Sequence, residues 1–329
     1  DALRFNLITG NSPGNDMRFF VEKCEAMRNF ANKIWNASRF VMMNLSIDKV
    51  QLPEKLELED KWVLSRLNTL IREVTDNLEA YELGVASAKI YDFIWDTYCD
   101  WYIELTKTRL NGEDESAKLA AENVLCYVLL RILELLHPFM PFITEEIYQA
   151  LPGSAETIMN EKWPGDENMK VWAEDCADFE KLMDYIKAVR AMRAEMNVHP
   201  AKKTSMVIET ASPAAFEKGG AYLARFAFAT DVTVTAKYEG STDGMVNVAT
   251  PDAKGFIPMM ELIDRDKELA RLNKEKAKAE KEMAMFANQL NNPKFVERAP
   301  AALVEEIRTK FAKSQDKLAN IEQSIKTLG

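Results

Sequence analysis

The sequence is poor in the residues that build metal sites and disulfide scaffolds. It has two histidines and four cysteines in 329 residues, and no two cysteines stand at CxxC spacing. Zinc-ligand spacing is therefore absent, and a disulfide framework is not expected in a chain of this length. We interpret Cys24, Cys99, Cys126 and Cys176 as buried or idle thiols in a reducing compartment.

Membrane and targeting signals are also missing. No apolar run approaches the ~20 residues that span a bilayer, and the first ten residues lack the basic-then-apolar order of a signal peptide. We therefore predict a cytoplasmic protein without membrane contact. The chain does not begin with Met, so we expect it to begin in the middle of a longer protein.

Catalytic signatures are not visible. The chain has no GxGxxG, P-loop or GxSxG motif, and nothing singles out a catalytic pair among its carboxylates. His137 and His199 have no second histidine nearby, and we expect a structural role for both. We predict no catalytic residues and no metal site in this chain.

The residues that are abundant favour helix. Hydrophobic residues make up 47% of the chain, whereas glycine and proline number only 12 each, a composition typical of a mainly α protein. The formal net charge is −10. An acidic protein binds nucleic acid only through locally basic surface, so the net charge neither supports nor excludes such binding.

Apolar periodicity predicts a helical bundle in the first half of the chain. Asn11, Ser12, Pro13 and Gly14 form turns, and Asn15 or Asp16 can cap the helix that follows. Long helices with short connections are typical of an up-and-down bundle. The predicted helices cover about 17–44, 58–82, 85–109, 115–136, 142–150 and 178–197.

The pattern changes twice after the bundle. Short runs with β-branched residues predict strands at 204–210, 231–236 and 245–249, with helix over 214–228 between the first two. We therefore divide the chain into a helical bundle with its leading segment (1–165), a small α/β junction (166–258) and a C-terminal arm (259–329). The fold class is mainly α.

The arm has the heptad-like spacing of an antiparallel helical hairpin. A turn at Asn291-Asn292-Pro293 separates the two halves. Lys276 occupies one position of the first seam, which is otherwise apolar. The seam positions are Leu269, Leu272, Lys276, Ala279, Met283, Phe286 and Leu290, followed by Val304, Ile307, Phe311, Ser314, Leu318, Ile321, Ile325 and Leu328.

The densest group of candidate binding residues lies in the first long helix, in RNFANKIWNASRF (residues 28–40). Apolar residues occupy one face, and arginine, lysine and asparagine occupy the rest. RNA loops are bound by stacking on aromatic or guanidinium planes and by hydrogen bonds to base edges. The alternative, the ordinary polar side of an amphipathic helix, stays open. Asp100-Trp101-Tyr102, in the third helix, is interpreted as core.

The arm differs from the rest of the chain in charge. Residues 261–329 contain 14 Lys and Arg against 12 Asp and Glu, a net +2, which leaves −12 for residues 1–260. Solvated flanks of a coiled coil explain this contrast, and so does contact with phosphates. The local cluster that favours the second explanation is Arg271, Lys274, Lys276, Lys278 and Lys281.

Several short stretches of the chain carry a family resemblance. DALRF (1–5) resembles the element after the KMSKS loop, and residues 28–40 resemble the opening helix of the anticodon-binding bundle, in class I aminoacyl-tRNA synthetases for valine, isoleucine and leucine. FIWDTYCDWYIELTK (93–107), LLHPFMPFITEEIYQ (135–149) and EKWP (161–164) are similar to further elements. The resemblance covers most of residues 1–200, in order.

The last third of the chain resembles the bacterial valyl branch. LNNPKFVERAPAALVEE (290–306) is similar to the hinge of its C-terminal coiled coil, and GFIPMMELIDRDKELARL (255–272) is similar to the approach to that coiled coil. AVRAMRAEMNVHPAKK (188–203) resembles its linker. The HIGH and KMSKS signatures and the editing domain are not found in the sequence, so the resemblance implies the tRNA-binding C-terminal portion of a longer ligase.

The resemblance implies tRNA(Val) as the partner, with no DNA, and we expect a monomer. ATP and Mg²⁺ would serve the whole ligase, with no cofactor in this chain. A fragment of another class I ligase and a coiled-coil protein scaffold are the alternatives. The candidate anticodon residues are Arg18, Arg28, Asn32, Lys33, Asn36, Arg39 and Phe40. The candidates for the outer corner of the tRNA are Arg271, Lys274, Lys278, Lys281 and Arg298.

Overall fold

The computed structural model divides into two compact units, residues 1–183 and 184–329. It describes residues 1–9, 16, 18–165, 170–199, 201–262, 265–291 and 301–328, and it omits the side chains of 265–271, 301–303, 320 and 323–328. The predicted division into three parts is neither confirmed nor contradicted by these two units. Within the described ranges, no helix is both long enough and apolar enough to cross a membrane.

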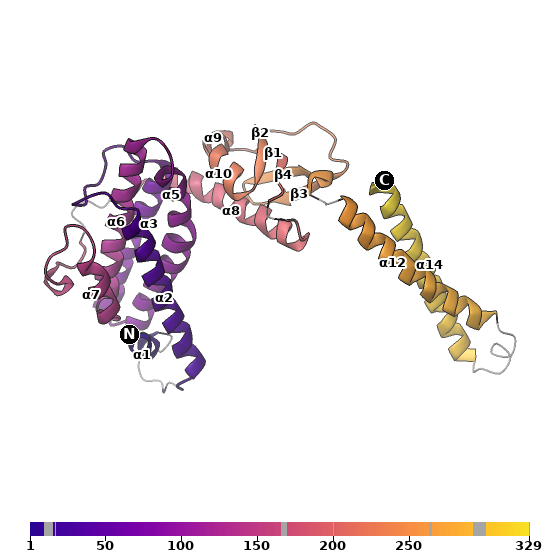
Figure 1. The fold of residues 1–329 in the computed structure, drawn as a ribbon, viewed down its shortest axis with the longest axis horizontal. Helices are drawn as coiled ribbons and strands as arrows, with labels where there is room; N and C mark the ends of the chain where they lie inside the picture. Colours follow the sequence, from indigo (N-terminus) through magenta and orange to yellow (C-terminus); the bar gives the residue numbers. More distant parts are fainter. Residues whose placement is uncertain are drawn as a thin grey trace. The chain divides into compact units, whose positions relative to one another are not determined.

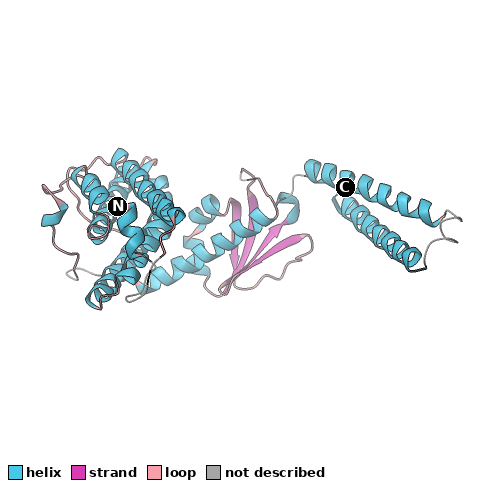
Figure 2. Ribbon diagram, turned by 90° about the horizontal axis from the view of Figure 1, so that it is seen from below, coloured by secondary structure: helices cyan, strands magenta, loops and turns pink. Residues whose placement is uncertain are grey.

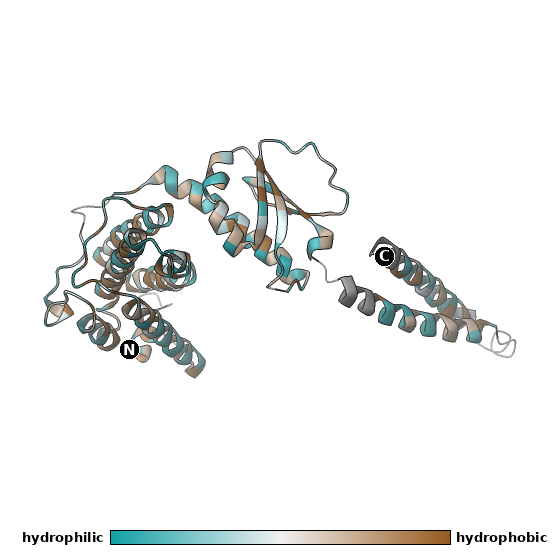
Figure 3. Ribbon diagram, turned by 45° about the horizontal axis from the view of Figure 1, so that its top comes forward, coloured by the Kyte–Doolittle hydropathy of each residue, from teal (hydrophilic) through white to brown (hydrophobic). Residues whose placement is uncertain are grey.

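The first unit is a helical bundle (Figure 1), which confirms the predicted mainly α fold. Its core is apolar, with Phe30, Leu67 and Leu129 among the buried side chains, and Figure 3 shows apolar stretches along the bundle helices. Its elements are α1 (Ala2–Ile8), α2 (Val21–Met43), α3 (Leu58–Glu79), α4 (Leu83–Asp92), η1 (Phe93–Tyr102), α5 (Ile103–Leu110), α6 (Glu115–Leu136), α7 (Pro141–Gln149), the short η2 (Ile158–Asn160) and the first part of α8 (Ala173–Glu195).

Buried polar side chains connect the bundle helices. The Asp60 carboxylate, at the start of α3, accepts hydrogen bonds from the Tyr102 hydroxyl at 2.7 Å and from both terminal nitrogens of Arg109 at 2.6 and 2.8 Å. Asp60 is fully buried, and a buried carboxylate needs such partners. In α6, Glu122 Oε2 accepts from the backbone N–H of Ser46 at 2.7 Å, which holds the connection between α2 and α3.

Three predicted helix boundaries are wrong, and one of them is the start of α8, which lies at Ala173 rather than Asp178. Helix α2 begins at Val21 rather than Met17; Met17 and the predicted turn and cap residues 11–15 lie outside the described residues. Helix α3 ends at Glu79 rather than Glu82, because Tyr81 takes a left-handed conformation with φ 60°. The N–H of Glu82 then donates to the carbonyl of Asn77 at 2.8 Å and closes the helix. Gly84 lies inside α4.

The helix predicted over 85–109 corresponds to α4, η1 and α5, which follow one another without a break. Its central segment, η1, is a π-helix. The buried residues Phe93, Tyr98 and Tyr102 recur at steps of five and four, longer than the 3.6-residue α period. The wider π turn therefore keeps all three on the inner side. It also brings the Tyr98 hydroxyl to the carbonyl of Leu125 at 3.0 Å.

The second unit contains a four-stranded sheet in the order β2-β1-β4-β3 (Figure 2). β1 and β2 are parallel, whereas β4 is antiparallel to both β1 and β3. The predicted strands are confirmed, but β4 was missed. Its glycine, proline and lysine are poor strand formers. The elements are β1 (Thr204–Thr210), α9 (Pro213–Lys218), α10 (Gly220–Phe226), β2 (Ala229–Thr235), β3 (Met245–Ala249) and β4 (Ala253–Pro258).

The end of α8 packs closely on this sheet. A Cβ atom at Gly255 of β4 would overlap the phenol group of Tyr185, so glycine is required at that position. Tyr185 also meets Phe216 edge-on, with 5.7 Å between ring centroids. The helix ends at Glu195, and Asn197 beyond it adopts a left-handed φ of 52°.

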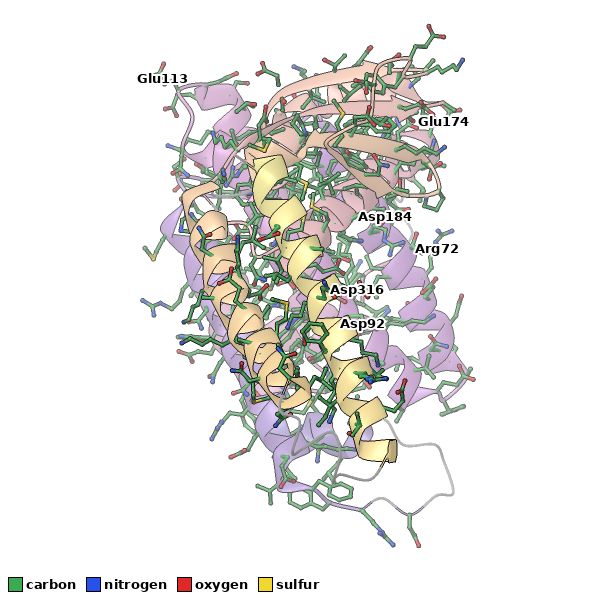
Figure 4. The ribbon with its side chains drawn as sticks, turned by 90° about the vertical axis from the view of Figure 1, so that its right-hand side faces the viewer. Arg72, Asp92, Glu113, Glu174, Asp184 and Asp316 are labelled. Atoms are coloured by element: carbon green, nitrogen blue, oxygen red, sulfur yellow. The ribbon has the colours of Figure 1, made fainter. Side chains whose placement is uncertain are left out.

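The predicted hairpin is confirmed in α12 (Arg265–Leu290) and α14 (Ala301–Leu328), which follow the short α11 (Met259–Leu262). Leu272, Ala279 and Ile321 form its buried seam, with Leu318 packed against them. Charged residues face outward, including Asp316 of α14 (Figure 4). The other five residues labelled there, Arg72, Asp92, Glu113, Glu174 and Asp184, are also exposed.

Candidate nucleic-acid interface

Helix α2 has one buried and one exposed side. Phe30, Ile34 and Val41 are buried in the bundle core. Arg28, Asn32, Asn36 and Arg39 are all exposed, and their steps of four, four and three place them on one face of a helix. The structure therefore gathers these predicted residues on a single solvent-facing surface of α2.

A groove of about 470 Å³ lies between α2 and the η1–α5 segment. Four of the seven predicted anticodon residues, Asn32, Lys33, Asn36 and Phe40, line it. The structure thus brings these four together with a second helix, which the sequence did not indicate. The full lining is Asn29, Asn32, Lys33, Asn36, Ala37, Phe40, Cys99, Ile103, Glu104 and Lys107.

The groove combines apolar and polar groups. Ala37 and Ile103 contribute apolar surface, and burial raises the pKa of the Cys99 thiol to about 12. Cys99 is therefore a neutral thiol at physiological pH and behaves as a small hydrophobic residue. An aromatic ring, apolar surface and several amide groups are the chemistry that binds an unstacked nucleobase.

Lys33 differs from the other predicted contacts because its ammonium group is bound within the protein. Its Nζ lies 2.7 Å from Asp100 Oδ1 and 3.3 Å from the carbonyl oxygen of Trp95, both in η1. It also lies 3.6 Å from the centroid of the Trp95 ring. These contacts, which we call the Lys33 clamp, join the two walls of the groove. Asp100 is exposed and Trp101 is half-buried, so the interpretation of these three residues as core holds only for Tyr102, which is fully buried.

The remaining predicted residues, Arg18, Arg28 and Arg39, do not line the groove. Arg28 stands 4.0 Å from Glu25, with both side chains largely exposed. Arg39 is exposed, and no ion pair is seen for it among the described residues. Arg18 is exposed and precedes α2. Trp35, on the same outer side of α2, is 38% exposed; an indole in solvent is a stacking candidate that sequence analysis did not single out.

Three polar residues of the groove were not predicted from the sequence. Asn29 precedes Asn36 by two helical turns, and this spacing was an available signal. Glu104 and Lys107 are on α5, where the sequence gives no hint that this segment faces α2. Lys107 Nζ lies 2.5 Å from Glu104 Oε1 and 5.3 Å from the centroid of the Phe40 ring.

In the hairpin, Lys274, Lys278 and Lys281 of α12 are exposed at steps of four and three, opposite the seam residues Leu272 and Ala279. We call these three lysines the α12 lysine face. Lys276 instead lies in the seam, 2.7 Å from Glu322 of α14. The side chain of Arg271 and the whole of Arg298 lie outside the described residues.

The two histidines make local structural contacts. His137 Nδ1 is 2.7 Å from the Thr144 hydroxyl, and burial lowers the pKa of His137. His199 Nδ1 accepts from the N–H of Ala201 at 3.2 Å. Both contacts are local and fit the predicted structural role. Among the described residues, no three His, Cys, Asp or Glu side chains are grouped as ligands of a metal ion.

Comparison with protein families gives two matches. Residues 60–208 match the anticodon-binding domain of tRNA ligases, and residues 264–329 match the valyl tRNA synthetase tRNA binding arm. The first match includes η1 and α5 and begins after α2. These two matches place the chain among proteins that carry the helical anticodon-binding domain of tRNA ligases.

The similarity to curated proteins extends over the whole chain. The chain is 48% identical to a valine–tRNA ligase of Clostridium acetobutylicum, 46% to one of Clostridium perfringens and 42% to one of Listeria monocytogenes. The chain belongs to the valine–tRNA ligase family, which confirms the predicted resemblance. It is covered completely in each comparison and spans about 38% of the length of each relative.

Among solved structures, a chain of the LeuRS–tRNA–LeuAMS ternary complex from Agrobacterium radiobacter K84 matches 53% of this chain, and the match covers 20% of that chain. The TM-score is 0.38 and the identity is 20%. This likeness is too distant to support an argument about fold or function.

Proposed function

We propose that this chain is the tRNA-binding portion of a cytoplasmic valine–tRNA ligase. In the whole protein, ATP and Mg²⁺ would serve the joining of valine to tRNA(Val). The observation that carries the proposal is the α2–η1–α5 groove, because residues expected to contact an anticodon line it within a chain of this family. We take the bound form to be a monomer.

The proposed mechanism is positioning. Phe40 stacks an unpaired anticodon base, and the amides of Asn32 and Asn36 bind base edges. Arg28, Arg39 and Arg18 lie outside the groove and would contact the backbone of the anticodon loop. Holding one end of the tRNA orients its acceptor end toward the reacting groups of the whole ligase, which lowers the entropic part of the barrier.

The hairpin supplies the second contact in this proposal. The α12 lysine face, with Arg271 and Arg298, would bind phosphates at the outer corner of the tRNA. Phosphate contacts add affinity without sequence preference. The groove would therefore determine which tRNA is bound, and the arm would contribute much of the binding affinity.

Filter binding tests the proposal with three RNAs: valine tRNA, isoleucine tRNA and a valine tRNA with a substituted anticodon. We expect valine tRNA to bind at least about tenfold more tightly than the other two, the effect of one good base contact. Asn36→Ala should remove most of this preference. Equal binding of all three RNAs would contradict an anticodon site, and no binding at all would favour a protein scaffold.

A further inference from the structure

The α5 wall of the groove presents two side chains of opposite hydrogen-bonding character. Glu104 and Lys107 both line the groove, and their side chains are 41% and 32% exposed. Their charged ends lie 2.5 Å apart, Oε1 to Nζ. A carboxylate only accepts hydrogen bonds and an ammonium only donates them. The pair therefore offers an acceptor and a donor side by side, each with further bonding capacity.

This arrangement matches the edges of some bases better than others. Adenine and cytosine carry an exocyclic amino group, a donor, next to a ring nitrogen that accepts. Guanine and uracil carry a carbonyl, an acceptor, next to a ring N–H that donates. Carboxylates accordingly recognise amino groups of bases. The asparagines of α2 cannot make this distinction alone, because an amide has both a donor and an acceptor.

The groove brings the Glu104–Lys107 pair to the ring on which a base would stack. Lys107 Nζ lies over the Phe40 ring, 5.3 Å from its centroid, so a base that stacks on Phe40 lies next to the pair. The Lys33 clamp holds α2 against η1 through Asp100 and Trp95. Since η1 continues directly into α5, the clamp also keeps the two walls at a fixed separation.

We propose that Glu104 and Lys107 are specificity-determining residues that select an amino-bearing base over a keto base at one anticodon position. The inference rests on the proposed function. Pairing with valine codons gives every valine tRNA an anticodon that ends in adenine and cytosine, both of which have the amino group that Glu104 accepts. Lys33 is a positioning residue for this pair rather than an RNA contact.

The test uses valine tRNA and two variants, one with guanine for adenine at the second anticodon position and one with uracil for cytosine at the third. Each change replaces an amino group with a carbonyl. The proteins are the unaltered chain, Glu104→Gln, and the exchanged pair Glu104→Lys with Lys107→Glu. Glu113→Gln, exposed and outside the groove, is the control. Binding is measured with all three RNAs, and thermal unfolding checks the fold.

The unaltered chain and Glu113→Gln should discriminate against both RNA variants by about tenfold. In Glu104→Gln, the amide can face either edge, so discrimination should fall below about twofold at one position and persist at the other. The exchanged pair keeps the ion pair but reverses the order of donor and acceptor. It should prefer the keto base at that same position.

Three other outcomes are informative. If Glu104→Gln and the exchanged pair fold normally and keep both preferences of the unaltered chain, the inference is overturned and the proposed function stands. The inference is also overturned if the variants lose affinity equally for all three RNAs, which would indicate a general electrostatic contact. If the unaltered chain ignores both anticodon changes, the proposed function itself fails.

Discussion

Single residues of the bundle show how burial changes the chemistry of a side chain. Glu134 of α6 is 6% exposed, and burial raises its pKa to about 7, with Glu161 adding to the rise and Arg131 opposing it. Its ion pair with Arg131 is 2.7 Å long, but its Oε2 atom is buried without a hydrogen-bond partner among the described residues. The carboxylate form is therefore poorly stabilised.

This environment makes the stability of the protein depend on pH. Between the ordinary glutamate pKa of 4.5 and a pKa of about 7, the folded state binds a proton that the unfolded state does not. The free energy of unfolding should consequently fall as the pH rises through this window. Glu134→Gln does not titrate and should be more stable than the unaltered protein at pH 8, by on the order of 2–3 kcal/mol, with no such advantage near pH 5.

Urea unfolding at pH 5, 6, 7 and 8 measures this difference. Glu146→Gln, at an exposed glutamate of the neighbouring α7, is the matched control and should follow the unaltered protein within ~0.5 kcal/mol at each pH. Parallel pH profiles for the unaltered protein and Glu134→Gln would show that Glu134 is ionised in the fold at every pH tested.

At the scale of elements, the regular patterns were predictable and the irregular ones were not. Helix α6 has the bounds that apolar periodicity predicted, and strands β1 and β3 have the bounds that runs of β-branched residues predicted. The π-helical segment η1, at the centre of the helix predicted over 85–109, was not predictable. Its register is set by partners distant in sequence, such as Leu125 for the Tyr98 hydroxyl.

The candidate site was predictable on one helix only. Local spacing placed Asn32, Asn36 and Phe40 on α2, and the groove contains all three. The opposite wall depends on tertiary packing, so Glu104 and Lys107 were missed. Lys33 was named as an RNA contact because its type and position fit. Its internal bond to Asp100, 67 residues away, has no local signal in the sequence.

The end of α3 offers a test at this scale. Tyr81 is 82% exposed and holds a left-handed φ of 60°, a conformation that costs residues with a Cβ about 1 kcal/mol and costs glycine little. Tyr81→Gly should therefore raise the free energy of unfolding by ~0.5–1 kcal/mol. Tyr81→Ala keeps a Cβ and should give no such gain. Urea unfolding compares the two, and equal stabilities would mean that the backbone at Tyr81 is unstrained.

At the scale of the whole molecule, the charge is uneven: residues 261–329 carry a net +2, whereas residues 1–260 carry −12. The net charge is −10, so general attraction of RNA to the protein is not expected. Binding should instead depend on particular cations. In the proposed function, the bundle groove supplies base preference and the α12 lysine face supplies phosphate contact, and the two contributions respond differently to salt.

The salt dependence of tRNA binding separates these contributions. The logarithm of the binding constant falls with the logarithm of salt concentration by roughly 0.7–0.9 for each phosphate that a cation neutralises. Changing Lys274, Lys278 and Lys281 together to Gln should therefore reduce the slope by about 2 to 3 and weaken binding of every tRNA alike. Preference for the valine anticodon should survive, because the groove is untouched.

The matched control removes the same charge from the other helix of the hairpin. Lys310, Lys313 and Lys317 of α14 are exposed, and their change to Gln lowers the net charge equally. If the α12 face contacts phosphates, only the α12 variant changes the slope substantially. Equal changes in both variants would indicate a diffuse effect of net charge. An unchanged slope in the α12 variant, with the helix content intact by circular dichroism, would show that this face does not bind phosphate. The hairpin would then act as a spacer or bind another protein, and the anticodon groove would carry the whole of the RNA affinity.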